Sequence, residues 1–273
     1  MNNFDADTVE SFGSEWNRFD QSGLDRHELE AVFDDYFQIV PTEVFDRNSI
    51  VADIGCGSGR WANVIAPKVG KLVCFEPSQA QEVAQKNLAR HSNVEIHSLR
   101  IDQLEGFAES FDFSYSLGVV HHIPDTRQAI IDCVKTVKPG GYCLFYIYYA
   151  LDNRPFWFRS IWRASNLIRR FVAGRSETIK DVLCDLIAFS IFVPFKLLNV
   201  TLKKFRIPTK NVPLSYYSDK SILTLRTDAR DRFGTPLEQR FSQTQIEKML
   251  EDAGLTEIKF SNQAPYWCVI GKK

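Results

Sequence analysis

The sequence predicts an α/β fold, a mostly parallel sheet with helices on both faces, from three observations. Apolar runs of strand length alternate with helical segments between residues 49 and 149, which is typical of parallel sheets. The run Ile50–Ile54 ends in glycines at 55, 57 and 59, a pattern typical of a buried strand that turns tightly into a helix. Residues 242–271 return to helix and strand patterns after a segment of different composition. We therefore expect one α/β domain that an insert interrupts.

The individual elements follow from periodicity and from the residues that end them. Strands are expected at 49–54, 71–76, 93–97, 111–118, 142–149, 255–260 and 265–271. Helices are expected at 25–39, 59–66, 78–90, 125–137 and 242–253. Pro67 should stop the second helix, Ser242 and Gln245 have the pattern of a capping box, and Gly254 should end the last helix. The short connection between the last two strands suits an antiparallel edge pair.

The glycine-rich turn differs from the loop that binds nicotinamide dinucleotides. That loop, G-x-G-x-x-G, needs a small third residue where its helix packs on its strand, and Arg60 stands there. Asp53, two residues before Gly55, would repel a pyrophosphate and would suit a cationic or hydrogen-bond-donating ligand. A dehydrogenase is therefore disfavoured.

A second carboxylate ends the next strand. Glu76 follows the apolar run 71–75 and lies 21 residues after Gly55. At that place a carboxylate can accept hydrogen bonds from both hydroxyls of a ribose. The ligand is therefore expected to contain a nucleoside without a phosphate at the loop, and S-adenosylmethionine fits this description.

These motifs resemble those of the class I S-adenosylmethionine-dependent methyltransferases. Asp53–Gly59 is similar to the first motif of that family, Phe75–Pro77 to the second, Phe111–Asp125 to the fourth, and Val137–Tyr148 to the turn and fifth strand. The resemblance covers residues 49–149 and implies a Rossmann-like sheet of seven strands, mostly parallel with an antiparallel last strand. The expected boundaries are 1–149 with 236–273 for the donor-binding domain, and 150–235 for a helical insert between strand five and the last helix.

The resemblance implies a set of cofactor-binding residues. Residues expected to hold the methionine portion are Asp53, Gly55, Cys56, Gly57 and Gly59, and those for the ribose are Glu76 and Pro77. Leu117 and Gly118 should pass close to the donor. Where most members carry Asp for adenine, this chain has Arg100, so Asp102 or the backbone at Ile101 is expected to take that place.

The segment 12–19 is similar to one that folds over the donor in some relatives. Trp16 and Phe19 would cover the donor, and Arg18 would pair with its carboxylate. An ordinary docked arm is the alternative interpretation.

Two histidines follow the fourth strand at the edge where open α/β folds bind ligands. Methyl transfer from a sulfonium is an in-line displacement that mainly needs alignment, but a hydroxyl acceptor also needs a base. His122, or else His121, is the candidate base. The alternative is that one histidine fixes the turn before Pro124. No metal site is expected, because no third ligand is spaced nearby.

Composition limits the remaining possibilities. The chain has 273 residues, 44% of them hydrophobic, and a net charge of −1, so no global basic footprint suggests nucleic acid. Its six cysteines form no C-x-x-C pair and are expected to be buried thiols in a reducing cytoplasm. The acidic start of the chain lacks the apolar core of a secretory signal. We expect a cytoplasmic protein.

The insert differs chemically from the rest. Residues 151–210 hold 12 Lys and Arg against 4 Asp and Glu, whereas residues 1–150 hold 12 against 22. In the segment 155–171 an apolar stripe, with the arginines mostly off it, consists of Trp157, Ile161, Ala164 and Ile168. A nearly apolar segment follows at 179–205, and Pro194 should kink it.

Three interpretations of this insert stay open. It is a helical lid that packs its apolar faces on the domain, an interfacial hairpin on the anionic inner face of a membrane, or a surface for nucleic acid or a second copy. The uncharged run 186–195 is too short to span a bilayer, which takes ~20 residues.

The sequence thus predicts methyl transfer from S-adenosylmethionine to a small-molecule or lipid-like acceptor, at oxygen. Tyr217, Asp231 and Arg232 are the candidate acceptor-binding residues, since their segment re-enters the domain before the last helix. RNA or protein methylation is the alternative reaction, and a non-catalytic S-adenosylmethionine-binding module is the non-enzyme alternative.

Overall fold

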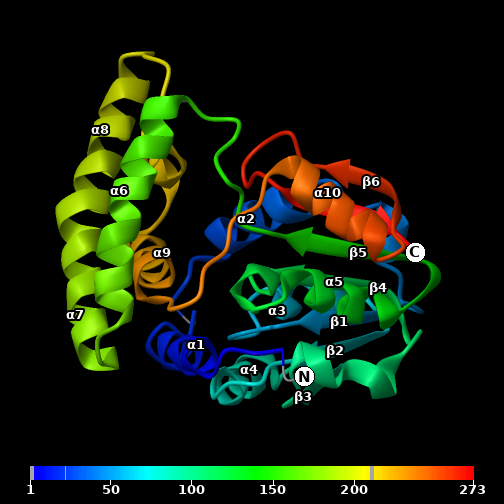
Figure 1. Ribbon diagram of the computed structural model, residues 1–273. Coiled ribbons are helices and arrows are strands. Elements are labelled where there is room, and N and C mark those ends of the chain that lie inside the picture. Colours follow the sequence, from blue (N-terminus) through cyan, green and yellow to red (C-terminus); the bar gives the residue numbers. More distant parts are fainter. Residues whose placement is uncertain (1–2, 22, 210–211) are drawn as a thin grey trace. The chain divides into compact units, whose positions relative to one another are not determined.

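The computed structural model describes residues 3–21, 23–209 and 212–273, which form two compact units (Figure 1). The first unit comprises Met1–Gln21, Leu29–Ala150 and Leu237–Lys273, and the second comprises Ser22–Glu28 and Leu151–Pro236. The chain therefore leaves the first unit after β5 and returns to it before the last helix.

The first unit contains a seven-stranded sheet in the order β3-β2-β1-β4-β5-β7-β6. Its strands are β1 (Ile50–Ile54), β2 (Lys71–Phe75), β3 (Val94–His97), β4 (Phe111–Leu117), β5 (Val137–Tyr146), β6 (Thr256–Phe260) and β7 (Cys268–Lys272). Strands β1 to β5 pair in parallel, while β7 runs antiparallel to both β5 and β6. The prediction of a mostly parallel sheet that ends in an antiparallel pair is confirmed.

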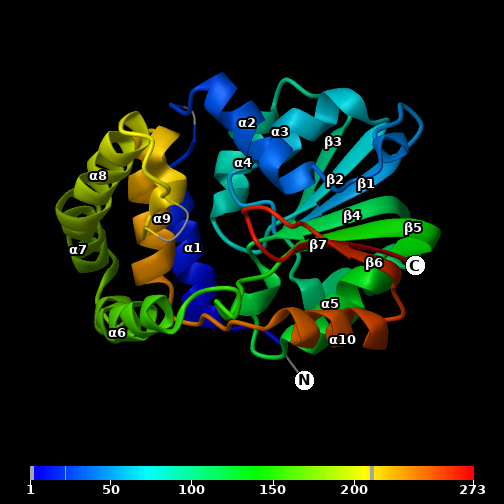
Figure 2. The same ribbon diagram turned by 90° about the horizontal axis from the view of Figure 1, so that it is seen from above.

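Helices cover both faces of this sheet because its strands are apolar on both sides. Val51 joins the cluster packed against α2 (Arg26–Phe37), α3 (Ala62–Ile65) and α4 (Ala80–Leu88). Its neighbour Ala52 points to the other face, where α5 (Thr126–Lys135) and α10 (Gln243–Asp252) pack. Figure 2 shows α2, α3 and α4 on one side of the strands and α5 and α10 on the other. The capping box of Ser242 and Gln245 begins α10 as expected.

Several boundaries differ from the prediction by a few residues, and three of the differences have a local cause. The helix expected at 59–66 begins only at Ala62, because Gly59 has φ +78° and stays in the turn. Pro67 does not follow that helix directly but lies inside a 3₁₀ turn, Ala66–Lys68, whose first residues need no N–H donor. Strand β5 begins at Val137 rather than 142, with an irregularity in its pairing before Tyr142.

The second unit is helical. It contains α6 (Phe156–Ala173), α7 (Glu177–Ile187), a π-helical turn (Ala188–Phe192), α8 (Val193–Lys204), a short 3₁₀ helix (Ser215–Asp219) and α9 (Ile222–Gly234). Pro194 stands in the first turn of α8, just after the π-helical turn, which is where the sequence predicted a kink. In the described ranges, none of the helices combines the length and the apolar character that crossing a bilayer requires.

Helix α9 is at the centre of this unit. Its Leu225, Ala229 and Phe233 are buried with Val172 of α6 and Cys184 of α7. Arg230, whose side chain is fully buried, pairs with Asp181 at 3.0 Å and with Glu177. Arg226 binds Asp185 through two hydrogen bonds of 2.9 Å. Ion pairs thus fix α7 to α9, as buried charges require partners.

Helix α6 exposes the stripe of Trp157, Ile161, Ala164 and Ile168. The lid, hairpin and interface interpretations of the insert stay predictions. Arg169 is buried, because its guanidinium donates to the carbonyl oxygens of Thr235 (2.8 Å) and Pro236 (3.0 Å). Backbone carbonyls at the end of α9 therefore compete with solvent for this arginine, a contact that helical periodicity does not reveal.

Candidate functional site

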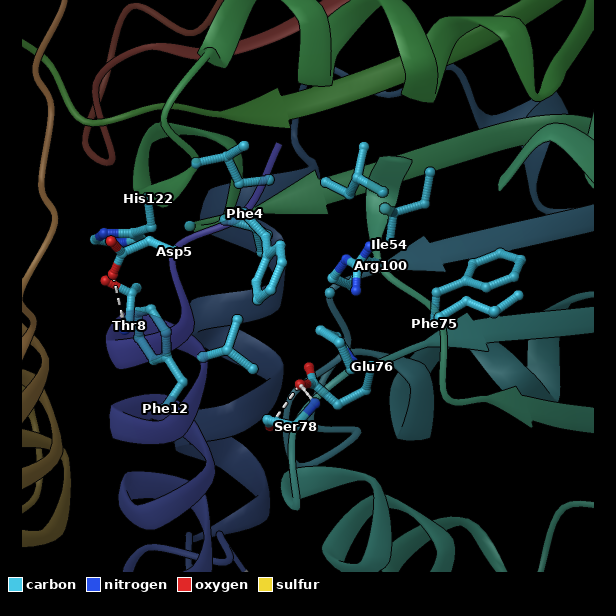
Figure 3. A pocket seen from close by; sticks show the side chains of 18 of the residues that line it. Phe4, Asp5, Thr8, Phe12, Ile54, Phe75, Glu76, Ser78, Arg100 and His122 are labelled. Atoms are coloured by element: carbon cyan, nitrogen blue, oxygen red, sulfur yellow. Dashed lines mark hydrogen bonds between the residues drawn. The ribbon is translucent and has the colours of Figure 1, made fainter. Parts of the chain in front are cut away.

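A pocket of about 130 Å³ opens at the carboxyl ends of the central strands. Ile54 of β1, Phe75 of β2 and Leu117 of β4 line it. Strand order reverses between β1 and β4, and the crevice at such a point is where open α/β sheets bind ligands. Helix α1 (Ala6–Arg18) supplies another side of the pocket, as Figure 3 shows.

The three glycines of the turn allow close packing within the protein. All three have positive φ, and a Cβ on Gly55 would lie 2.6 Å from Val119. A Cβ on Gly57 would lie 2.9 Å from the indole nitrogen of Trp16, and one on Gly59 would lie 2.8 Å from Leu88. These distances are too short for any side chain, so the turn requires glycine at each position.

The amide groups of this turn bond mostly to the protein itself. The N–H groups of Gly55 and Cys56 donate to the carbonyl oxygen of Phe75, and that of Gly59 donates to Cys56. Of the turn residues expected to hold the ligand, only Gly55 lines the pocket, whereas Cys56, Gly57 and Gly59 support its shape. The sequence identified the turn correctly. The turn shapes the pocket, while most of its amide groups bond within the protein.

Glu76 lines the pocket at the end of β2, as Pro77 does. Its Oε1 accepts hydrogen bonds from the amide (2.9 Å) and hydroxyl (2.6 Å) of Ser78, and its Oε2 accepts one from the amide of Gly57 (2.9 Å). Each carboxylate oxygen has two lone pairs. Oε2 therefore keeps one acceptor position, and Figure 3 shows the carboxylate held beside Ser78.

After β3, Arg100 stands where most members of the family carry a carboxylate, and the ring of Phe4 from the N-terminal arm lies against it. Arg100 and Ile101 line the pocket, and the guanidinium lies 4.3 Å from the ring centre of Phe4, which also lines it. Asp102 does not line the pocket. Although burial opposes the change, hydrogen bonds from Arg100 and from the Asn3 amide lower the pKa of Asp102. Asp102 therefore positions Arg100 and the start of the chain.

The N-terminal arm contributes more of the pocket than the sequence indicated. Trp16 lines it as expected, and so do residues that the sequence analysis missed, Asn3, Phe4, Asp5, Thr8, Val9 and Phe12. Asn3 exchanges two hydrogen bonds of 2.9 Å with the backbone of Asp125, and the Asp5 side chain caps α1. The recurrence of Thr8, Phe12 and Trp16 at four-residue spacing was the signal that one helix face was involved. Arg18 and Phe19 stack on each other outside the lining.

The two histidines have different surroundings. His122 lines the pocket beside Phe12, with ring centres 4.9 Å apart. Its Nδ1 lies 2.6 Å from the carbonyl oxygen of Leu237, so Nδ1 carries the proton in the neutral ring and Nε2 carries the lone pair. His121 is fully buried and does not line the pocket. Burial, with His122 and Arg240 nearby, lowers the pKa of His121 well below its usual range. His121 is thus suited to holding the turn and Tyr148, whose amide lies 3.3 Å from its ring.

Asp53 is buried beneath the turn and accepts a hydrogen bond of 2.8 Å from the hydroxyl of Tyr115. Burial raises the pKa of Asp53 to about 8, with the Tyr115 hydrogen bond opposing the rise and the charge of Glu76 adding to it. Asp53 does not line the pocket. Its carboxyl therefore keeps its proton near neutral pH until a positive charge comes near.

Leu117 and Gly118 line the pocket, as expected for the end of β4. The candidate acceptor residues Tyr217, Asp231 and Arg232 belong to the second unit. There Tyr217 packs on Phe192, and the Arg232 guanidinium lies 5.2 Å from the ring centre of Trp162. An acceptor role for these three stays a prediction. Lys210, the last residue of the basic segment 151–210, lies outside the described residues.

Comparison with known proteins shows similarity to methyltransferases. The family model described as "Methyltransferase domain" matches residues 52–145. Over 193 residues the chain is 28% identical to the ubiquinone biosynthesis O-methyltransferase of Agrobacterium fabrum, which covers 65% of this chain and 75% of that protein. The same enzyme of Rhizobium rhizogenes is 30% identical over 136 residues, 48% of this chain and 53% of that protein.

A different kind of relative matches a shorter stretch. The tRNA U34 carboxymethyltransferase of Desulfotalea psychrophila is 31% identical over 102 residues, 35% of this chain and 31% of that protein. Apart from the Agrobacterium protein, the chain thus spans about half, or less, of the length of these curated relatives.

Solved structures share the fold. YcgJ of Bacillus subtilis superposes with a TM-score of 0.51 at 15% identity, over 86% of this chain and 70% of that chain. An O-methyltransferase family protein from Burkholderia thailandensis gives a TM-score of 0.53 at 16% identity, over 89% of this chain and 55% of that chain. The family resemblance that the motifs predicted is confirmed, and with it S-adenosylmethionine as the cofactor.

Proposed function

The chain is similar to the class I S-adenosylmethionine-dependent methyltransferases over residues 52–145, and from that premise we propose that it methylates a hydroxyl oxygen of a small, lipid-like acceptor. The position of His122 carries the choice of oxygen. Its Nε2 holds a lone pair on a pocket-lining ring that the Leu237 carbonyl orients. A hydroxyl must lose its proton as it attacks, so a base at this place serves that acceptor. The curated relatives named ubiquinone biosynthesis O-methyltransferase support the same choice.

The pocket residues fit the donor. The remaining acceptor position on Oε2 of Glu76 suits one ribose hydroxyl, and Ile101, with the Phe4 ring and the Arg100 guanidinium, suits a flat adenine. Asp53 does not line the pocket but lies beneath the turn, where the positive methionine end of the donor would favour release of the Asp53 proton. When bound, the sulfonium supplies a methyl group that is already activated for displacement.

The protein aligns the donor and the acceptor, excludes water from the pocket and removes the acceptor proton. Phe12, Val119 and Ile123 are apolar lining residues that exclude water near His122. Nε2 takes the acceptor proton, and the Leu237 carbonyl stabilises the charged ring that results. His121, neutral because it is buried, positions its neighbour and takes no proton.

We also propose that the second unit binds the acceptor, with Tyr217, Asp231 and Arg232 as contributors, and that residues 151–210 bring it to a lipid surface. The composition of the second unit supports this proposal. This unit exposes aromatic and aliphatic side chains together with cations, which suits an apolar or anionic acceptor. The Asp231 carboxylate and Arg232 guanidinium are polar groups of the kind that orient such a molecule.

Two measurements test the proposal. Calorimetry with S-adenosylmethionine and, separately, NAD should show binding of the first alone. Transfer of a labelled methyl group should then be measured to phenols with and without an isoprenoid chain, and to tRNA. Labelled phenol ether supports the proposal, with faster turnover of the isoprenoid compound. Labelled tRNA without labelled phenol would replace it by the RNA alternative, and donor binding without any transfer would favour a binding module.

A further inference from the structure

The helices of the second unit expose an apolar face. On α6 this face includes Ile161, Ile168 and Phe171, which are 54%, 46% and 57% exposed. On α7 and the π-helical turn, Ile179, Val182, Leu186 and Phe189 recur at intervals of three and four residues, so they form one stripe on the helix surface. Isolated exposed apolar side chains are ordinary, but aligned rows on neighbouring helices mark an interaction surface.

Charge is sorted across the same helices. The acids of α7 are Glu177, Asp181 and Asp185, and all three bond to Arg230 or Arg226 of α9. The basic residues that stay exposed on α6 and at the end of α8 include Arg159, Arg163, Arg170 and Lys204. With 3.6 residues per turn, the three arginines lie together on one side of α6, away from Ile161 and Ile168. The acids of α7 are thus neutralised internally while the outer surface stays cationic.

We propose that the exposed apolar rows of α6 and α7, together with the basic residues of α6 and of the end of α8, dock on the surface of an anionic lipid bilayer. Apolar side chains would enter the boundary between headgroups and acyl chains, and the long basic side chains would reach the lipid phosphates. A second copy of the chain fits less well, because it would bring cations against the same cations. This inference rests on the proposed function, since docking would bring the enzyme to a membrane-borne acceptor. The surface itself consists of residues of the second unit alone.

Vesicle co-sedimentation of the full chain tests the proposal. Vesicles of phosphatidylcholine with about one third phosphatidylglycerol should bind the protein, pure phosphatidylcholine should bind it weakly, and added salt should weaken the binding. Each exposed arginine removed should lower the partition coefficient about fivefold, so R159Q/R163Q/R170Q should lower it about a hundredfold. I161S/I168S/F171S should abolish the binding.

The matched control removes the same charge from the first unit. Lys86, Lys248 and Lys259 are exposed there, and K86Q/K248Q/K259Q should leave vesicle binding within about twofold. Circular dichroism confirms folding of each variant, and calorimetry with S-adenosylmethionine reports on the donor site separately. Lost vesicle binding with intact donor binding in the arginine variant supports the inference.

Three results would overturn it. These are no binding to either vesicle by the unaltered protein, equal losses for the arginine and lysine variants, and a dimer in sedimentation velocity that I161S/I168S/F171S converts to a monomer. The last result would assign the face to a second copy. Vesicle binding by a protein that does not bind S-adenosylmethionine would instead refute the proposed function and leave this inference standing.

Discussion

Replacing Asp53 by asparagine should change how the stability of the ligand-free protein depends on pH. The pKa of Asp53 rises from 3.8 to about 8 because the carboxyl is buried. In the unfolded chain the group ionises near pH 4. Between these two values, unfolding therefore releases a proton that the folded protein keeps.

The sign follows from this proton release. A carboxyl with a raised pKa in the folded state makes the protein less stable as the pH rises from about 4 to about 8. The loss is about 1.4 kcal/mol per pH unit, or about 3 kcal/mol between pH 5 and pH 7. An asparagine side chain cannot ionise. The free energy of unfolding of D53N should therefore rise by about 3 kcal/mol relative to that of the unaltered protein between pH 5 and pH 7. The Tyr115 hydroxyl can still donate to the amide oxygen.

Urea unfolding at pH 5, 6 and 7 measures the difference. D112N is the matched control, because hydrogen bonds from Ile50 and Lys138 outweigh burial and lower the pKa of Asp112. That group is ionised in both states throughout the interval, so D112N should shift stability by a constant amount. Parallel curves for D53N and the unaltered protein would refute the reasoning. Saturating S-adenosylmethionine should flatten the curve of the unaltered protein alone if its cationic end lowers the pKa of Asp53.

Three further predictions concern the turn, the base and the second unit. G57A should lower donor affinity at least tenfold in calorimetry, because the new Cβ would displace Trp16. The control is G140A, which also has positive φ but has nothing within 4 Å of the new Cβ. It should cost about 1 kcal/mol of stability and leave donor affinity unchanged. H122Q can still donate to Leu237 but cannot take a proton, so kcat should fall about 10²- to 10⁴-fold at constant donor KM, and an unchanged kcat would exclude the base role. R230M should lower the free energy of unfolding by on the order of 3 kcal/mol, and R226M, at a partly exposed pair, by about 1 kcal/mol; equal effects in urea titrations would contradict the central place of Arg230.

Strand and loop positions in the first unit were predictable because they depend on local pattern. Apolar runs that end in Gly55 or Glu76 specify strand ends, and parallel pairing brings those ends to one edge. The family motifs then indicated the donor pocket. Sequence could not show that most amides of the turn are used internally, because those bonds depend on how β2 and Glu76 meet the turn.

Long-range contacts explain what the sequence did not predict. Phe4 and Phe12 line the pocket in an arm that Asn3 ties to Asp125, 122 residues away. Arg169 is buried because the carbonyls of Thr235 and Pro236 lie beside it, which no periodicity on α6 indicates. Helix patterns in the insert indicated where its helices lie but left open which face of α6 is buried.

The backbone of Leu237 links the candidate base to the chain that returns from the helical unit. This residue begins the last segment of the first unit. Its N–H donates to the Thr8 hydroxyl at 3.1 Å, and its carbonyl oxygen accepts from the His122 ring. A change of backbone conformation at Leu237 would therefore shift the imidazole of His122 and the Thr8 side chain of α1 together.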